Sequence, residues 1–221
     1  MQKPGFYIDL AANDPILRSN TFFFDTCLSW AGLCIEAMPR HHERLREHRN
    51  CEVIPKCISS TSAPMYFREK GRVGGAAAVV SKTDVAGDEE LHPIECTLLD
   101  TVLKDREISH VDVLQLDIEG HEMPAISSVN FNKTTIDIII LEKKPAVEEH
   151  LISRFGYRKI TDQNLGKDVV LLRPGFELLI GKGVVPYSKK RAKGRAQNDM
   201  FGLPVVYQSW SVLTDVGGCS R

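Results

Sequence analysis

Long apolar runs are missing from the 221-residue sequence. No uncharged apolar stretch approaches the roughly 20 residues that cross a bilayer. The segment Met1 to Gly5 leads directly into an apolar strand, without the basic and apolar regions of a signal peptide. We therefore expect a soluble, cytoplasmic protein with no membrane span.

Closely spaced cysteines are missing too. The six cysteines are dispersed along the chain without a C-x-x-C pair. Most of them have apolar neighbours, as small buried hydrophobic residues do. This pattern predicts free buried thiols and a reducing compartment rather than a framework of disulfides. Cys51 and Cys57 are the one pair that remains a candidate for a disulfide.

A strong charge of either sign is absent as well. The chain has 28 basic and 29 acidic residues and a formal net charge of −1, so nothing draws it as a whole to nucleic acid or to an anionic membrane. The basic run Ser188 to Arg195 lacks the interleaved aromatic residues that stack on bases, and we interpret it as a solvated extension. The composition argues against a nucleic-acid partner and indicates no oligomeric state.

What the sequence does contain is an alternation of short apolar runs with longer amphipathic ones. This alternation predicts a doubly wound α/β fold with a mostly parallel sheet. The predicted strands are residues 6–10, 32–36, 51–54, 111–116 and 136–141, followed by an antiparallel hairpin of 157–161 and 168–173. The predicted helices are residues 19–30, a helix that begins at Pro39, a short helix before residue 104, and 146–155.

Two further segments have a weaker pattern. Residues 59–90 are rich in glycine and have little helical period, which predicts a hairpin around Met65 to Phe67 and a lid that includes Gly74 to Ala78. Beyond Pro174 the alternation ends. We therefore divide the chain into a core of residues 1–174 and a partly disordered C-terminal extension of residues 175–221.

Acidic residues stand at the ends of three of the predicted strands. Asp9, Glu36 and Asp117 each close an apolar run, and ligands of open parallel sheets bind beyond the carboxyl ends of the strands. Glu36 lies 27 positions after Asp9, close to the roughly 20 positions at which a second acid accepts hydrogen bonds from a ribose. The pattern therefore predicts a site for an adenosine cofactor.

The first loop distinguishes between adenosine cofactors. A dinucleotide site needs three glycines, so that pyrophosphate can approach a helix N-terminus, whereas Ala11 to Asp14 contains none. Asp14 would repel pyrophosphate but would pair with the ammonium or sulfonium of S-adenosylmethionine. The loop therefore favours a methyl donor over a nicotinamide dinucleotide.

Six segments resemble, in the same order, the FkbM-type S-adenosylmethionine-dependent methyltransferases. They cover most of the chain to about Pro174. They are IDLAAND at Ile8 to Asp14, SNT at Ser19 to Thr21, WAGLCIEAMP at Trp30 to Pro39, LDIEGHE at Leu116 to Glu122, IIILEKK at Ile138 to Lys144 and FGYRKI at Phe155 to Ile160.

The resemblance implies a Rossmann-like methyltransferase fold, a seven-stranded, mostly parallel sheet whose last strand is antiparallel. The usual N-terminal helix is not visible before Phe6. It also implies an enzyme that methylates a hydroxyl of a small molecule or a glycan. By position in the motifs, the residues that would bind S-adenosylmethionine are Asp9, Ala11, Ala12, Asn13, Asp14, Asn20, Glu36, Ala37 and Asp117.

Transfer to oxygen often needs a base that removes the hydroxyl proton. Asp117, Glu119 and His121 are the candidates. Asp117 is favoured by its position, and His121 is favoured by an ordinary pKa that suits a base. Asp117, Glu119 and Glu122 together offer oxygen ligands of the kind that a hard metal cation prefers. Acidic residues at the start of a helix, however, more often interact with the helix dipole. We therefore predict no metal.

The main alternative is a methyltransferase-like interaction module without turnover. Ala11, where many FkbM relatives have glycine, and the short N-terminus favour this alternative. The presence of Asp9, Glu36 and Asp117 together favours the enzyme. A nicotinamide-dependent oxidoreductase is a third possibility, opposed by the missing glycines.

Overall fold

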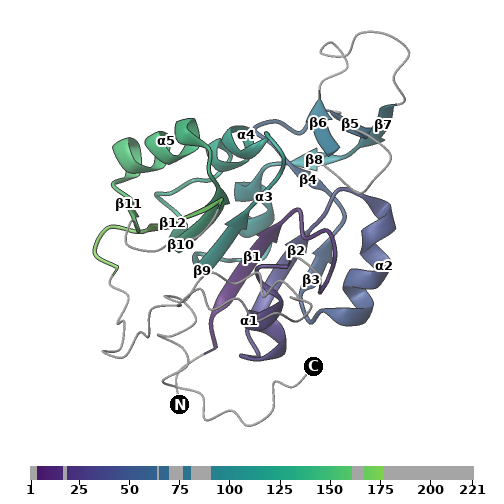
Figure 1. Cartoon of the computed structure of the whole chain (residues 1–221), viewed down its shortest axis with the longest axis horizontal. Coiled ribbons are helices and arrows are strands. Elements are labelled where there is room, and N and C mark those ends of the chain that lie inside the picture. Colours follow the sequence, from purple (N-terminus) through teal and green to yellow (C-terminus); the bar gives the residue numbers. More distant parts are fainter. Residues whose placement is uncertain are drawn as a thin grey trace, which may run out of the picture.

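The structure is a computed structural model of the chain, and it describes residues 4–16, 19–63, 65–69, 77–80, 91–160 and 167–176. A seven-stranded sheet with the order β11-β12-β10-β9-β1-β2-β3 runs through its centre (Figure 1). The strands are β1 (Phe6–Leu10), β2 (Ala31–Ile35), β3 (Glu52–Ile54), β9 (His110–Leu116), β10 (Thr135–Glu142), β11 (Arg158–Lys159) and β12 (Asp168–Leu172).

The direction of the strands confirms the predicted sheet. Within this sheet, the neighbouring strands β3, β2, β1, β9 and β10 are parallel. The last strand, β12, is antiparallel to both β10 and β11. Residues 136–141, an apolar run interrupted by Asp137, have five hydrophobic side chains that are at most 1% exposed, as expected for a central strand covered on both faces.

Helices cover both faces of the sheet, and the core has two parts. Three helices, α3 (Leu99–Lys104), α4 (Glu122–Ser127) and α5 (Pro145–Phe155), contribute to one hydrophobic cluster. The helices α1 (Phe22–Thr26) and α2 (Pro39–His48) contribute to the other. Side chains alternate between the two: Val169 and Leu171 of β12 belong to the first cluster, and Val170 and Leu172 to the second.

The helix boundaries follow the expected signals except in α1. Pro39 and Pro145 begin α2 and α5, where proline gives up no hydrogen bond, and Gly156 ends α5 in a left-handed conformation with φ 73°. The prediction of one helix over 19–30 is wrong in extent. Ser19 accepts the backbone N–H of Phe22, and Thr21 donates its hydroxyl to Asp9, so these residues belong to the preceding loop.

Two smaller sheets follow β3. Strand β4 (Cys57–Ile58) pairs in parallel with β8 (Cys96–Thr97), and β5 (Met65–Glu69) pairs antiparallel with β6 (Ala77–Val80) and β7 (Leu91–Ile94). The antiparallel pairing of β5 confirms the predicted hairpin. Residues 74–76 of the predicted lid, and the extension beyond residue 176, lie outside the described residues, so the lid and the division of the chain stay predictions.

The prediction of free thiols is wrong. Disulfides join Cys34 to Cys51 and Cys57 to Cys96, so Cys51 does not pair with Cys57. Cα–Cα distances of 5.7 and 4.4 Å lie within or at the limit of disulfide reach. The spacing in the sequence did not reveal which strand ends would be neighbours. The argument for a reducing, cytoplasmic compartment rested on free thiols and loses that support.

None of the helices within the described ranges is long and apolar enough to cross a bilayer.

Candidate functional site

Three strands end side by side at the predicted site. Leu10 of β1 pairs with Ile35 of β2 on one side and with Leu116 of β9 on the other. The next residues along the chain are Ala11, Glu36 and Asp117. The fold thus brings together, at one edge of the sheet, residues from segments that lie far apart in the sequence.

Glu36 connects the loops that follow β1 and β2. Its side chain is buried, and its two carboxylate oxygens accept the backbone N–H groups of Asn13 (2.9 Å) and Met38 (2.7 Å). These charge-assisted bonds fix the carboxylate, and each oxygen keeps a lone pair for a further donor. Ala37 lies half-buried between Glu36 and Met38.

The first loop makes a tight turn without glycine. Ala11 has φ 62° and Asn13 has φ 45°, a left-handed conformation that asparagine tolerates better than alanine. The backbone N–H of Ala11 donates to the carbonyl of Ile35 at 2.9 Å. Ala12 is buried and Asn13 is exposed. The left-handed position at the start of this turn is therefore occupied by alanine.

Asp14 already has a cation beside it. Its Oδ2 lies 2.8 Å from Nη1 of Arg44 on α2, and its Oδ1 accepts the backbone N–H of Ile16. Arg44 neutralises the carboxylate that the sequence assigned to a cationic cofactor group.

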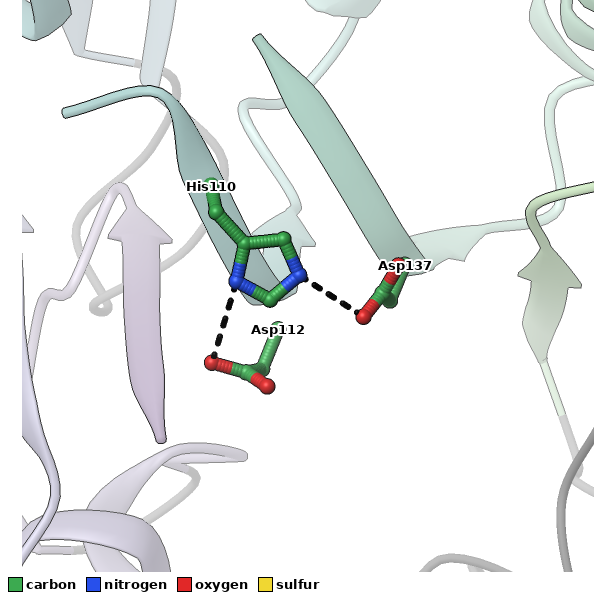
Figure 2. Close-up of side chains that lie close together, drawn as sticks. All are labelled: His110, Asp112 and Asp137. Atoms are coloured by element: carbon green, nitrogen blue, oxygen red, sulfur yellow. Dashed lines mark hydrogen bonds and ion pairs between the residues drawn. The ribbon is translucent and has the colours of Figure 1, made fainter. Parts of the chain in front are cut away.

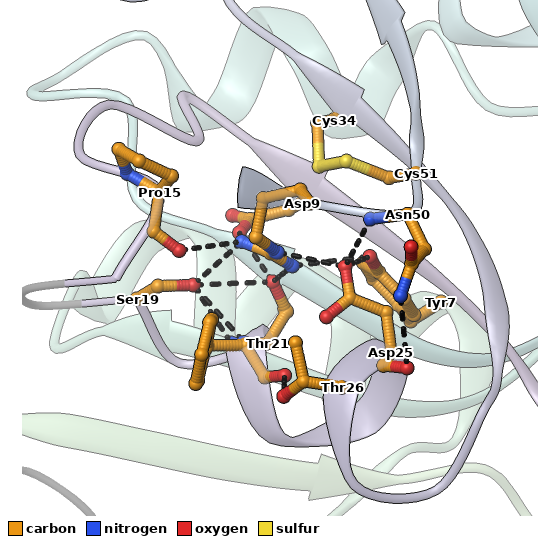
Figure 3. A network of polar contacts seen from close by, with 12 residues as sticks. Tyr7, Asp9, Pro15, Ser19, Thr21, Asp25, Thr26, Cys34, Asn50 and Cys51 are labelled. Carbon is orange, nitrogen blue, oxygen red and sulfur yellow. Dashed lines mark hydrogen bonds and ion pairs between the residues drawn. A yellow bond between two sulfur atoms is a disulfide. The ribbon is translucent and has the colours of Figure 1, made fainter. Parts of the chain in front are cut away.

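Asp9 faces the interior of the protein (Figure 3). It is 4% exposed; its Oδ2 accepts the Thr21 hydroxyl at 2.5 Å and lies 3.9 Å from Nη1 of Arg49. Burial raises the pKa of Asp9, whereas Arg49 and the Thr21 hydroxyl lower it. Asn20, next to Thr21 in the loop between β1 and α1, is half-buried.

Asp117 and Glu119 belong to an acidic group after β9. Desolvation, followed by repulsion from Glu119 and Glu142, raises the pKa of Asp117 to about 6, although its side chain is exposed to solvent. Glu119 is exposed and has φ 52°. Nζ of Lys144 lies 3.0 Å from Glu142 and 3.7 Å from Glu122, and it balances part of this negative charge.

His121 has different surroundings. Its Nε2 lies 3.0 Å from the Ser59 hydroxyl oxygen, and Ser59 is buried at the end of β4. Burial lowers the pKa of His121 against the opposing effect of Glu122, so the imidazole is neutral and can accept a proton. The three predicted catalytic residues therefore follow the same strand but do not form one hydrogen-bonded set.

Sequence reasoning missed three residues that support this edge. Nothing in the sequence marks Arg49 or Ser59 as part of a site. Arg49 stands at the end of a charged run whose other residues are mostly exposed. His42, which we interpreted as solvated surface, is half-buried, and its Nε2 lies 2.8 Å from the carbonyl oxygen of Glu36.

A second polar cluster lies at the opposite ends of β9 and β10 (Figure 2). His110 is 2.9 Å from Asp137 and 3.9 Å from Asp112, and candidate ligand atoms of the three residues lie within 4.8 Å of one another. Arg173 also donates to Asp137 at 2.7 Å, and the backbone N–H of Phe6 donates to Asp112 at 2.7 Å. These contacts connect β9 to β1 and to β10, and β10 to the residue that follows β12.

Comparison with known proteins assigns the family. The model of the FkbM methyltransferase domain matches residues 9–159. The chain belongs to the FkbM methyltransferase family. The matched range contains the residues that the sequence assigned to this site, from Asp9 on β1 to His121 after β9. Family membership makes the chain a methyltransferase.

Other comparisons add little to the family assignment. A solved structure described as the human methyltransferase 10 domain containing protein is similar, with a TM-score of 0.41 and 13% sequence identity, over 80% of this chain and 74% of that chain. No curated protein matches the chain.

Proposed function

We propose that this FkbM methyltransferase transfers the methyl group of S-adenosylmethionine to a hydroxyl of a small molecule or a glycan. The observation that carries the proposal is the row of Ala11, Glu36 and Asp117 that follows three adjacent strands. Within this row Glu36 is buried and held by two backbone N–H groups. Ligands of open parallel sheets bind beyond such strand ends.

The chemistry of these side chains suits the proposed cofactor. Glu36 has acceptor capacity left for the two hydroxyls of a ribose. Asp9 precedes the first loop and accepts the Thr21 hydroxyl, so it helps to fix the loop that would border the methionine end. When bound, the cofactor would supply an electrophilic methyl carbon on a sulfonium sulfur. Glu36 and the first loop would fix the orientation that an in-line approach requires.

The proton of the acceptor hydroxyl needs a base on this chain. Asp117 is the member of the row that follows β9 and, with a pKa raised to about 6, is ionised at neutral pH. It would take the proton as the hydroxyl oxygen bonds to the methyl carbon and the carbon–sulfur bond breaks. His121, neutral because burial lowers its pKa, is the alternative base. Glu119 lies two positions beyond the row and is the third candidate.

Calorimetric titration of the whole chain with S-adenosylmethionine and S-adenosylhomocysteine tests this proposal. We expect both to bind. The Glu36→Gln variant should weaken binding by about tenfold or more, because it removes a charge that accepts hydrogen bonds. Asp112→Asn, a matched carboxylate change at the opposite strand ends, should leave binding unchanged. Folded protein that binds neither ligand would contradict the proposal, and binding of NADH in their place would favour an oxidoreductase.

One observation favours the alternative of a methyltransferase-like module without turnover. Ala11 holds a left-handed conformation that costs alanine more than glycine, so the loop beside the proposed cofactor site carries strain. Incubation with S-adenosylmethionine and a panel of sugars and hydroxylated small molecules separates the two functions. Methylated product together with S-adenosylhomocysteine supports the enzyme, whereas cofactor binding without product from any acceptor favours the module.

A further inference from the structure

Arg49 is a buried cation beside the proposed cofactor loop. It follows the last residue of α2, and its side chain is 0% exposed. Its guanidinium donates to five groups (Figure 3): the Asp25 carboxylate at 2.7 Å, the Thr21 hydroxyl at 2.8 Å, the Ser19 hydroxyl at 2.9 Å, the Tyr7 hydroxyl at 3.0 Å and the Pro15 carbonyl at 3.4 Å.

These partners belong to one continuous part of the chain. Tyr7 is on β1, Pro15, Ser19 and Thr21 are in the loop that follows it, and Asp25 is on α1. Arg49 therefore connects the strand, the loop and the helix that follows the loop. The Cys34–Cys51 disulfide holds the chain two residues after Arg49 to β2, the strand that leads into Glu36.

The charges in this network do not cancel by themselves. Asp9 and Asp25 are both buried, and Arg49 is the cation that faces them, 3.9 and 2.7 Å away. Burial raises the pKa of Asp9, and Arg49 is the strongest influence that opposes this rise. A carboxylate buried without its cation would take up a proton. Even with Arg49 and the Thr21 hydroxyl in place the pKa of Asp9 is raised, and Arg49 limits the rise.

We propose that Arg49 is a positioning residue for the methionine end of the cofactor, because it fixes the loop after β1 and, through Thr21, the side chain of Asp9. This inference rests on the proposed function. It also assigns a task to the residue that follows a surface helix, 40 positions after Asp9. Arg49 itself need not contact the cofactor, since it acts through Asp9, Thr21 and the loop backbone.

Two ligands separate this task from a general role in stability. S-adenosylhomocysteine has the amino-acid end, whereas 5′-methylthioadenosine keeps the adenosine and lacks that end. Glu36, which would hold the ribose, has no hydrogen bond to Arg49 among the described residues. A defect at the methionine end should therefore affect the first ligand and spare the second.

The experiment measures both dissociation constants for the whole chain and for Arg49→Lys. Lysine keeps the positive charge but cannot reproduce the branched set of donors. We expect S-adenosylhomocysteine to bind about tenfold more weakly, or worse, and 5′-methylthioadenosine to stay within about twofold. Arg106→Lys is the matched control. Arg106 pairs with Glu52 on the surface, with 29% and 54% of the two side chains exposed, and the variant should change neither constant.

Thr21→Val provides a second variant of nearly the same volume, in case Arg49→Lys does not fold. It removes the hydroxyl between Arg49 and Asp9 and should weaken S-adenosylhomocysteine selectively as well. Equal losses for both ligands in folded variants, or no loss, would overturn the inference while leaving the proposed function intact. If the parent protein binds neither ligand, the proposed function fails and this inference fails with it.

Discussion

Two clusters of arginine and carboxylates use the same chemistry in different surroundings. The Arg49 cluster (Arg49, Asp9 and Asp25) is buried, with Arg49 and Asp25 side chains 0% exposed. The Arg173 cluster (Arg173, Asp137, His110 and Asp112) is more open, with Arg173 39% and His110 50% exposed. Solvent weakens the second cluster. In the first, burial makes every missing partner costly. We therefore expect the buried Arg49 cluster, and not the Arg173 cluster, to determine the structure around the proposed cofactor site.

The largest effect should come from Arg49→Met. Methionine fills similar space but leaves Asp25 and Asp9 buried without their cation. We expect a loss of about 3–5 kcal/mol in the free energy of unfolding, measured by urea denaturation. A loss below about 1 kcal/mol would show that the buried cluster is no more important than a surface ion pair.

Arg173→Met is the corresponding change in the open cluster. Asp137 keeps His110 as a partner at 2.9 Å, and solvent reaches Arg173. The same urea experiment should show a loss of at most about 1 kcal/mol. If the two arginine variants lose equal stability, the contrast between the clusters is wrong.

Ala11→Gly sharpens the comparison at the level of the backbone. Glycine adopts the φ of 62° without the steric cost that alanine bears. Because glycine is also more flexible in the unfolded chain, we expect a net gain in stability of at most about 1 kcal/mol by thermal denaturation. Asn13→Gly is the control and should gain less, since asparagine tolerates φ of 45°. Destabilisation of the Ala11 variant would contradict strain at this position.

Asp117→Asn should have the smallest effect, and one that depends on pH. The pKa of Asp117 is raised in the folded state from 3.8 to about 6. The folded protein therefore loses stability as pH rises from about 3.8 to about 6, because Asp117 ionises more readily in the unfolded chain. Below this range Asp117 is protonated in both the folded and the unfolded protein, and its pKa shift costs no stability. The variant should match the parent near pH 3.8 and exceed it above pH 6, by less than about 1 kcal/mol because the side chain is exposed. A parent that gains stability across this window relative to the variant would refute the assignment.

The sequence was sufficient for the sheet and for the row of residues after its strands. The apolar runs that end in Asp9, Glu36 and Asp117 are local signals, and their alternation with amphipathic runs indicates a mostly parallel sheet. The family motifs lie in these same runs, so resemblance and pattern supported each other.

The partners of these acids could not be predicted, because they depend on contacts between distant segments. Arg49 follows a helix whose other arginines are exposed, and nothing local distinguishes it from them. The disulfides were missed for the same reason, since Cys34 meets Cys51 only when their strands lie side by side. The length of α1 depends on Thr21, whose hydroxyl bonds to Asp9.

Hydrogen–deuterium exchange with and without S-adenosylhomocysteine tests the central claim, that a methyl donor binds where β1, β2 and β9 end together. The backbone N–H groups of residues 11–14 and 36–38 should exchange more slowly when the ligand is present, because the ligand covers and orders both loops. Residues 110–112, at the opposite ends of the strands, should exchange at an unchanged rate. Protection at 110–112 without protection at 11–14 and 36–38 would contradict the account.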